Sequence, residues 1–376
     1  MTVTSRPDSE ATSRQRGRAL SGRLFRLAFR AALHLPGPVL DRIAGRGSDA
    51  ASRPGADPRA RFHAWMVRRF GGPPAVTLAE ARAPRLLSLS LLEGRPLPMQ
   101  EMRKLTLPGP GGPLRARFYQ PASAPTPSPA LIFLHFGGCV LGDLDTCHTA
   151  CTILAQHGGF RVLSVEYRLA PEHRYPAALE DAVAALHWLR REAASLGIDP
   201  SAIGIGGDSA GGYLAAAASL WLAARGEAQP KCQLLIYPVL EMNRLSLPPT
   251  PWDDCYPLTR TEIDWFARQY LRSPADVDDP LCSVARASSL AAMPPTILVQ
   301  AGHDLLFDEG AHLAERLRQD GVPLVHRVYP TLPHAFSAMS GGVPAARAAL
   351  VETALATGAT LRAPGSSSPK SDEDNR

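Results

Sequence analysis

Hydrophobic positions follow two different periods along the chain. Between residues 105 and 362, short apolar or alternating runs predict buried strands, and longer runs with helical spacing separate them. The predicted strands are Leu114–Tyr119, Ala130–Leu134, Val162–Glu166, Ile203–Gly206, Cys232–Tyr237, Thr296–Gln300 and Val325–Tyr329. The predicted helices are Ala177–Glu192, Gly211–Ala224, Asp308–Gln319 and Ala345–Thr357. Strands that alternate with helices predict an α/β fold, with a mostly parallel sheet covered by helices on both faces.

Residues 241–284 interrupt this alternation. They separate two predicted strands, contain prolines at 248, 249 and 251, and include a predicted helix near Arg260–Tyr270. A connection of this length is too long for a simple loop in a compact domain. We therefore expect an insertion above the edge of the sheet, at about residues 241–275.

The N-terminal part of the chain has a different pattern. Residues 1–19 are polar and predict disorder, as do residues 363–376 at the other end. Leucines and alanines in Leu20–Leu35 recur at helical spacing with arginines on another face, and prolines follow. A second short helix is predicted at Pro58–Phe70. This arm either packs over an active site as a cap or lies on a membrane as a basic amphipathic helix. The width of its apolar stripe favours packing.

Length and composition limit the classes of protein that fit. The chain has 376 residues, of which 45% are hydrophobic and 20% charged, as in ordinary globular proteins. Its 36 prolines and 31 glycines show no repeat period, which excludes collagen and coiled coils. No apolar stretch is long enough to span a bilayer, and the first residues lack the layout of a secretory signal. These observations predict a cytoplasmic protein.

Charge and cysteine content argue against two further classes. The net charge of +5 comes from the first 50 residues, where nine arginines stand against four acidic residues. A basic extension on a neutral body is not typical of a nucleic-acid-binding domain, whose folded face is itself basic. The six cysteines form neither a CxxC pair nor a zinc-binding spacing, so we expect reduced thiols and no metal site.

The strongest chemical signal is Gly207-Asp208-Ser209-Ala210-Gly211, which lies between a predicted strand and a predicted helix. In a G-x-S-x-G turn the serine adopts a strained conformation that exposes its hydroxyl. Glycines two positions away are needed because larger side chains would clash across the turn. A dinucleotide-binding turn would require glycine at position 209, so we predict that Ser209 is a nucleophile.

A nucleophilic serine needs a base and an acid, and in this type of fold the chain order is serine, acid, histidine. The histidines after Ser209 are His303, His312, His326 and His334. His334 is the predicted base because it follows the last predicted strand, at the edge where ligands bind in such sheets. Asp304 follows the preceding strand and is the predicted acid that orients the imidazole. Asp308 and Glu309 are alternatives that are better explained as charges at the start of the next helix.

A second glycine-rich turn follows the predicted strand Ala130–Leu134. Gly137 and Gly138 carry backbone N–H groups that could face a ligand, as does Ala210 beside the serine. Such donors stabilise the negative oxygen that forms when a carbonyl is attacked, and each contributes about 2.7–4 kcal/mol. We predict that these three N–H groups form an oxyanion hole.

Together these motifs resemble the hormone-sensitive-lipase-like family of bacterial esterases within the α/β-hydrolases. The matching stretches are His135–Thr146, Glu166–Asp181, Gly207–Gly212, Asp304–Glu309 and Tyr329–Phe336. They are spread over most of the chain at family-like spacing. In the second stretch, Tyr167-Arg168 predicts a hydrogen-bonded structural loop and not a catalytic element.

The resemblance implies an organisation and an activity. An eight-stranded catalytic core would span residues 105–362, with a helical cap formed by residues 20–104 and the insertion at 241–275. Ser209, Asp304 and His334 would be the catalytic residues. Members of the family typically hydrolyse short- to medium-chain esters without a metal or an organic cofactor.

The chain departs from the family pattern in the oxyanion turn. The family reads His-Gly-Gly-Gly followed by an aromatic residue, whereas this chain reads His135-Phe136-Gly137-Gly138-Cys139. The two donor glycines are retained, so the oxyanion hole should survive. Phe136 and Cys139 change the size and polarity of the site, and with Asp208 they are the predicted pocket residues.

The sequence therefore predicts a serine carboxylesterase that acts on a small-molecule ester through an acyl-enzyme. One alternative is a hydrolase of amides, lactones or polyesters that uses the same residues. Another is a binding protein, because plant gibberellin receptors share this fold but lack the functional histidine; the retained His334 argues against it. A homodimer and a peripheral membrane contact through residues 20–35 are further hypotheses.

Overall fold

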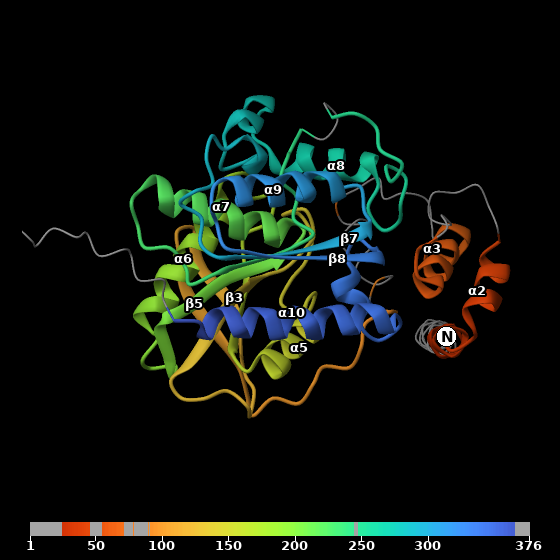
Figure 1. Ribbon diagram of the computed structural model, residues 1–376, viewed down its shortest axis with the longest axis horizontal. Helices are drawn as coiled ribbons and strands as arrows, with labels where there is room; N and C mark the ends of the chain where they lie inside the picture. Colours follow the sequence, from red (N-terminus) through yellow and green to blue (C-terminus); the bar gives the residue numbers. More distant parts are fainter. Residues whose placement is uncertain are drawn as a thin grey trace, which may run out of the picture.

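One mixed sheet forms the centre of the molecule (Figure 1). The computed structural model describes residues 25–45, 55–70, 78, 89, 91–243 and 247–364. Within these residues, eight strands lie in the order β1-β2-β4-β3-β5-β6-β7-β8. The strands are β1 (Glu101–Gly109), β2 (Gly112–Gln120), β3 (Ser128–Leu134), β4 (Arg161–Glu166), β5 (Ile198–Asp208), β6 (Gln233–Ile236), β7 (Thr296–His303) and β8 (Leu324–Pro333). Strand β2 pairs antiparallel with β1 and β4, and all other neighbours are parallel, which confirms the predicted sheet.

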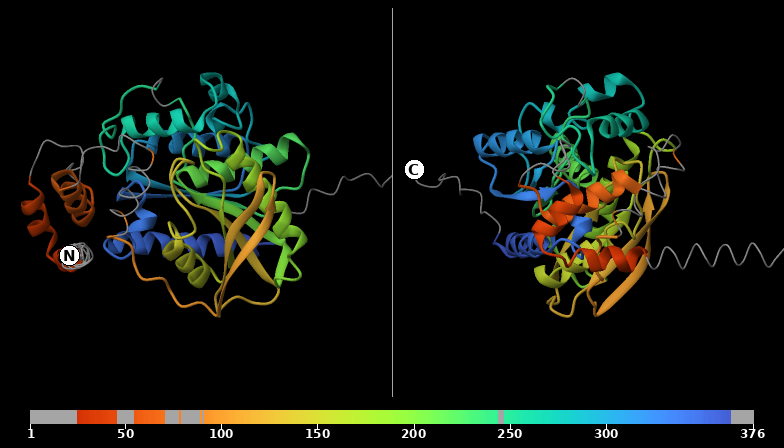
Figure 2. Two further views of the ribbon diagram at one scale, coloured as in Figure 1. Left: turned by 180° about the vertical axis from the view of Figure 1, so that it is seen from behind. Right: turned by 90° about the vertical axis from the view of Figure 1, so that its right-hand side faces the viewer.

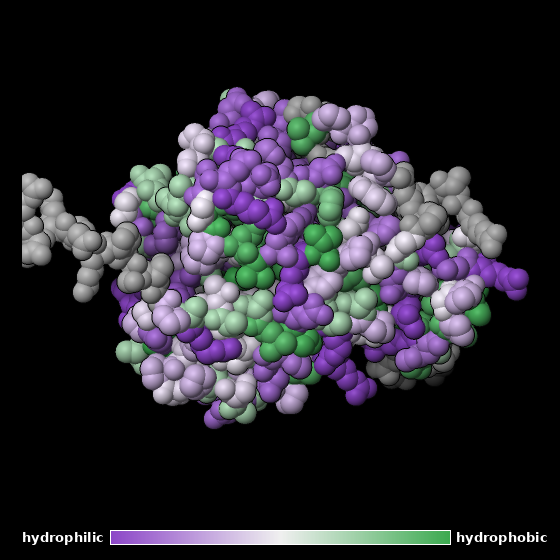
Figure 3. Space-filling view, in the orientation of Figure 1, coloured by the Kyte–Doolittle hydropathy of each residue, from purple (hydrophilic) through white to green (hydrophobic). Residues whose placement is uncertain are grey.

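The sequence of each strand reflects how far it is buried. Strands β3, β4 and β6 are mostly apolar and almost fully buried, because helices cover both faces there. All seven predicted strands coincide with observed ones apart from their ends. The edge strand β1 was not predicted, because Glu101 and Arg103 put charges at two of its less exposed positions. At the opposite edge, hydrophobic residues reach the surface along β8 between α9 and α10 (Figure 3), including Val325 and Val328.

Helices cover both faces of the sheet, with an apolar core on each side (Figures 1 and 2). One face carries α6 (Ala177–Arg191), α7 (Ala210–Ala224) and α9 (Phe307–Gln319), and the other carries α5 (His148–Gly158) and α10 (Pro344–Arg362). Helix α5 was not predicted. It is buried almost all round, so it lacks the polar stripe that marks a surface helix in a sequence.

The predicted insertion contains a helix at the expected position, α8 (Arg260–Tyr270). It begins with a capping box, in which Thr259 and Glu262 each accept a hydrogen bond from the other's backbone N–H. Two short 3₁₀ helices follow, η3 (Pro274–Asp278) and η4 (Val284–Arg286). The hydroxyls of Tyr270 and Tyr213 lie 3.2 Å apart, which fastens the end of α8 to the core helix α7.

The N-terminal arm lies at one end of the body (Figure 1) and has helical residues at 25–32, in α2 (Gly37–Ala44) and in α3 (Pro58–Phe70). Helix α3 has the predicted bounds. Helix α2 was not predicted, because Pro36 and Pro38 were expected only to end the preceding helix. Pro38 also stands in the first turn of α2, where the missing N–H of a proline costs nothing.

The arm packs through a different face from the predicted apolar stripe, whose described members Leu27, Ala31 and Leu35 are exposed. The ring of Phe29 stacks on that of Phe62 in α3, with centroids 5.8 Å apart, and Leu33 is buried. Residues 20–24 of the predicted helix lie outside the described residues, as do the segment 1–19 and positions 365–376 of the predicted tail. No helix in the described part of the chain is long and apolar enough to cross a membrane.

The segment between β4 and α6 is a hydrogen-bonded loop, as predicted for Tyr167-Arg168. Asp181 is fully buried at the start of α6 and accepts hydrogen bonds from the backbone N–H and the guanidinium of Arg168 at 2.8–3.0 Å. The same guanidinium reaches the carbonyl of Ala177 and the carboxylate of Glu180. This pair therefore ties the loop after β4 to helix α6.

We expect Asp181→Ala to lower the free energy of unfolding by about 3 kcal/mol, because it leaves the mostly buried Arg168 guanidinium without its main partner. Urea denaturation followed by circular dichroism measures this change. Glu180→Ala is the control: its carboxylate is more than a third exposed, so we expect a loss of less than about 1 kcal/mol. Equal losses in the two variants would contradict the assignment.

Candidate active site

Ser209 lies in a sharp turn between β5 and α7. Its backbone has φ 53° and ψ −115°, a strained conformation for a residue other than glycine. The Ser209 N–H donates to the carbonyl of Ile236 at 2.8 Å, which holds the turn against β6. A Cβ atom at Gly207 or Gly211 would come within 2.3 or 1.9 Å of the carbonyl oxygen of Leu134. Both flanking glycines are therefore required by the close approach of β3.

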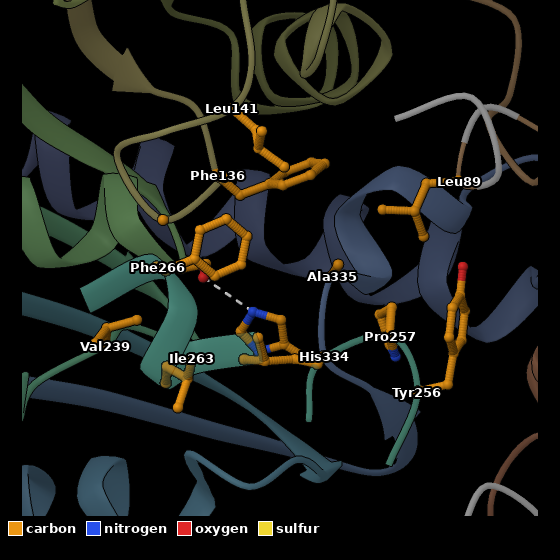
Figure 4. A pocket seen from close by; sticks show the side chains of 14 residues that line it. Leu89, Phe136, Leu141, Val239, Tyr256, Pro257, Ile263, Phe266, His334 and Ala335 are labelled. Atoms are coloured by element: carbon orange, nitrogen blue, oxygen red, sulfur yellow. Dashed lines mark hydrogen bonds between the residues drawn. The ribbon is translucent and has the colours of Figure 1, made fainter. Parts of the chain in front are cut away.

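His334 and Asp304 meet Ser209 at the carboxyl ends of the parallel strands. His334 directly follows β8, and Asp304 directly follows β7. The Nε2 atom of His334 lies 2.9 Å from Ser209 Oγ (Figure 4), and its Nδ1 atom lies 2.6 Å from Asp304 Oδ2. The other oxygen of Asp304 accepts the N–H of Leu306 at 3.0 Å. All three residues are at least 94% buried, so their hydrogen bonds are shielded from water.

This arrangement is suited to proton transfer. With Nδ1 protonated and held by Asp304, Nε2 is free to accept the proton of the Ser209 hydroxyl. The other histidines named as alternatives do not approach Ser209. His303 packs against Trp252, His326 lies between Arg318 and Gln300, and His312 is exposed on α9.

Gly137 and Gly138 lie beside Ser209 in the turn after β3. Their φ angles are 128° and 63°, which favour glycine, and a Cβ at Gly137 would lie 2.2 Å from the carbonyl oxygen of Leu141. Among the described residues, no acceptor takes the N–H of either glycine. Ala210 is the first residue of α7, so its N–H has no carbonyl partner within the helix. The structure thus brings together the three predicted donors, at the positive end of α7.

An apolar cavity of about 80 Å³ opens above these groups. Its wall is formed by Leu89, Phe136, Gly137, Gly138, Leu141, Ser209, Val239, Tyr256, Pro257, Leu258, Ile263, Phe266, His334 and Ala335. Figure 4 shows Phe136, Leu141 and Phe266 on one side and Leu89, Tyr256 and Pro257 on the other. Most of these residues were not predicted, because they come from segments without a catalytic motif. The sequence held one signal for this wall: Ile263 and Phe266 stand three positions apart in α8 and therefore share one face of the helix.

Of the three predicted pocket residues, Phe136 lies in this wall and Cys139 does not. Cys139 is 1% exposed, has φ 59°, and packs in the core near Tyr270 and Cys282. Burial raises the pKa of its thiol above the ordinary range. The prediction for Cys139 is therefore wrong, because the turn directs this side chain into the protein.

The prediction that Asp208 lines the pocket is also wrong. Its side chain is fully buried beneath the turn and accepts hydrogen bonds from Ser337 and Cys147, and the Tyr237 hydroxyl lies 3.3 Å from its Oδ2 atom. Burial raises the pKa of the Asp208 carboxyl to about 6, although these hydrogen bonds and the charge of His334 act in the opposite direction. Asp208 is the last residue of β5 and its side chain lies in the core, whereas the strained turn that follows directs Ser209 into the cavity.

The described part of the chain holds no group of three His, Cys, Asp or Glu side chains that could bind a metal ion. The chemical groups at the cavity are a serine hydroxyl, an imidazole paired with a carboxylate, and backbone N–H donors. Such a set can perform nucleophilic attack on a carbonyl and stabilise the resulting oxyanion.

A serine on a strand–turn–helix, followed along the chain by an acid and a histidine on later strands, is the arrangement of α/β-hydrolases. Residues 131–338 match the model of a family described by the alpha/beta hydrolase fold. The chain belongs to this family, and the predicted fold and family are confirmed.

Relatives that are named as ester hydrolases match most of the chain. It is 36% identical over 290 residues to "Carboxylic ester hydrolase LipN" of Mycobacterium tuberculosis, covering 74% of this chain and 76% of the relative. It is 38% identical over 247 residues to "Ethyl acetate hydrolase" of Pseudomonas putida, covering 64% and 77%. Among solved structures, the Pyrobaculum calidifontis esterase matches at 34% identity with a TM-score of 0.71, covering 78% of this chain and 96% of that one. The carboxylesterase EstE1 from a metagenomic library matches at 35% with a TM-score of 0.73, covering 78% and 100%.

We expect Gly137→Ala to lower kcat for p-nitrophenyl acetate by about 100-fold, the effect of losing one oxyanion donor. The new Cβ would collide with the backbone at Leu141, so the turn must shift. Gly226→Ala is the control, because Gly226 also has a positive φ (64°) but an added Cβ would meet nothing within 4 Å. Equal kcat values for the two variants would show that the Gly137 turn has no part in the reaction.

Proposed function

We propose that this protein is a serine carboxylesterase that hydrolyses short- to medium-chain acyl esters of small molecules. The observation that carries the proposal is the hydrogen-bonded series Asp304–His334–Ser209 at the floor of an apolar cavity. The relatives are named as ester hydrolases or esterases at 31–38% identity, which confirms the predicted class of enzyme. The roles of the individual residues belong to the proposal.

In the first half of the reaction, Ser209 Oγ attacks the ester carbonyl while His334 Nε2 accepts its proton. Asp304 holds the Nδ1–H group and stabilises the imidazolium that forms. The N–H groups at 137, 138 and 210 stabilise the negative oxygen of the tetrahedral intermediate. His334 then gives its proton to the departing alcohol, and the acyl group stays on Ser209.

The second half of the reaction returns the enzyme to its starting state. A water molecule takes the place of the alcohol and gives a proton to His334 as it attacks the acyl carbonyl. When the second tetrahedral intermediate collapses, the acid leaves and His334 returns the proton to Ser209. The enzyme thus needs no group beyond those of its own chain and water.

The cavity favours the short end of the acyl range. Its volume is about 80 Å³, and the rings of Phe136 and Phe266 stand in its wall. The side chains of its wall are mostly apolar, which suits an alkyl group better than a charged one. Relatives named ethyl acetate hydrolase and acetyl esterase support the same preference.

The alternative functions that the sequence allows differ in the substrate that the protein would accept. Hydrolysis of amides, lactones or polyesters would use the same residues, so a panel of these substrates distinguishes them from esters. A receptor role is less favoured because His334 is hydrogen-bonded to Ser209. The cytoplasmic location, a homodimer and a membrane contact through residues 20–35 stay predictions.

Replacing the nucleophile tests the proposal directly. We expect Ser209→Ala to lower kcat by about a millionfold, because attack and proton transfer both depend on its hydroxyl. Initial rates on p-nitrophenyl esters of two to sixteen acyl carbons measure this loss. Ser219→Ala, which removes another buried serine hydroxyl from α7, should leave kcat unchanged. Near-normal turnover by Ser209→Ala would refute the mechanism.

The cavity wall predicts the acyl-chain preference. The wild type should be fastest on the shortest esters, and Phe266→Ala should move the optimum to longer chains because it removes a large side chain from the wall. The measurement is kcat/KM across the same series of esters. Leu271→Ala, just after α8 and outside the wall, is the control. An unchanged chain-length profile in Phe266→Ala would contradict the assignment of this wall.

A further inference from the structure

A series of buried polar groups runs beneath the candidate active site. The Ser337 hydroxyl donates to Asp208 Oδ2 at 2.5 Å, and the Tyr237 hydroxyl donates to Ser337 Oγ at 2.5 Å. The backbone N–H of Ser337 donates to the oxygen of Tyr237 at 3.2 Å. All three side chains are at most 2% exposed. We call these residues the Asp208–Tyr237–Ser337 network.

Each member of the network adjoins a residue of the proposed mechanism. Asp208 immediately precedes Ser209, and Ser337 follows His334 by three positions. The ring of Tyr237 lies against the imidazole of His334, with centroids 4.8 Å apart and planes inclined by 56°. The network therefore connects the turn of the nucleophile with the turn of the base, and it supports one side of the imidazole.

The three turns that the network joins are all strained. Positive φ angles occur at Ser209 (53°), Tyr237 (36°) and Ala335 (56°), where side chains other than hydrogen are disfavoured. Such residues cost of the order of 1–3 kcal/mol each and persist only where the surroundings fix them. A buried hydrogen-bond network whose members are all satisfied provides that kind of rigidity.

We propose that Tyr237 is a positioning residue whose hydroxyl, held by Ser337 and Asp208, fixes the ring that keeps His334 Nε2 directed at Ser209. The inference rests on the proposed function. Tyr237 touches no reacting atom and lies outside the cavity wall, so it acts only through His334. A misplacement of about 1 Å at a reacting group lowers a rate by about 100-fold, which sets the size of the expected effect.

The test compares Tyr237→Phe and Ser337→Ala with matched variants outside the network. We expect each to lower kcat for p-nitrophenyl acetate by about 10- to 100-fold while KM stays within about twofold, because the cavity is unchanged. Tyr119→Phe and Ser219→Ala remove the hydroxyls of fully buried residues that belong to other hydrogen bonds, and they should leave kcat unchanged. Thermal unfolding of all four variants shows whether the network variants lose more stability than the controls.

The double variant Tyr237→Phe/Ser337→Ala adds a second criterion. Because the two hydroxyls act in one series, its kcat should be within about threefold of the slower single variant, not the product of the two effects. Multiplicative effects, or losses of kcat that the controls match, would overturn the inference. So would kcat values within twofold of the wild type in both single variants.

Two further comparisons distinguish failure of this inference from misfolding of a variant and from failure of the proposed function. If Ser337→Ala does not fold, the isosteric pair Ser337→Thr and Ser337→Val replaces it, since the two differ only in the hydroxyl. Threonine should retain most of kcat and valine should not; equal values would overturn the inference. A wild-type protein no more active than Ser209→Ala would instead overturn the proposed function, and this inference with it.

Discussion

Strands β3 and β5 lie side by side in the middle of the sheet, and at their carboxyl ends the carbonyl oxygen of Leu134 almost touches the turn that carries Ser209. Any side chain at Gly207 or Gly211 would overlap that oxygen. This contact forces the chain to leave β5 through a strained turn, so the serine hydroxyl enters the cavity. It also places the turn after β3, with Gly137 and Gly138, next to the same hydroxyl. The nucleophile and the proposed oxyanion donors therefore share one steric cause.

The free energy that these strained turns cost is offset by the apolar surface buried in the two cores. In the part of the chain that the structure describes, four residues other than glycine have positive φ angles, and all follow the carboxyl ends of parallel strands: Cys139, Ser209, Tyr237 and Ala335. The strands beneath them are almost fully buried between two layers of helices. A framework with this much buried apolar surface can hold a few unfavourable backbone angles without unfolding.

The sequence predicted the features that short-range patterns encode. Buried strands appear in the sequence as apolar runs, which predicted the sheet. The turn at Ser209 appears as a fixed spacing of glycines, and the order of the strands then predicted the positions of Asp304 and His334. Helix α5 was missed because burial on all sides removes the helical period from its sequence, and β1 was missed because charged residues occupy two of its five better-buried positions. Most of the cavity wall was missed because residues such as Leu89 and Phe266, far apart in the sequence, line one cavity only in three dimensions. Asp208 was misplaced because its motif does not show that its side chain faces the core.

The origin of the cavity wall has a consequence for how this enzyme could diversify. The groups that would perform the reaction all follow strands of the sheet, whereas Leu89 and the residues at 256–266 belong to segments outside it. Substitutions in α8 can therefore change which ester fits without moving Ser209 or His334. Selection for a new substrate could act on one part of the chain while the chemistry of the other part is preserved.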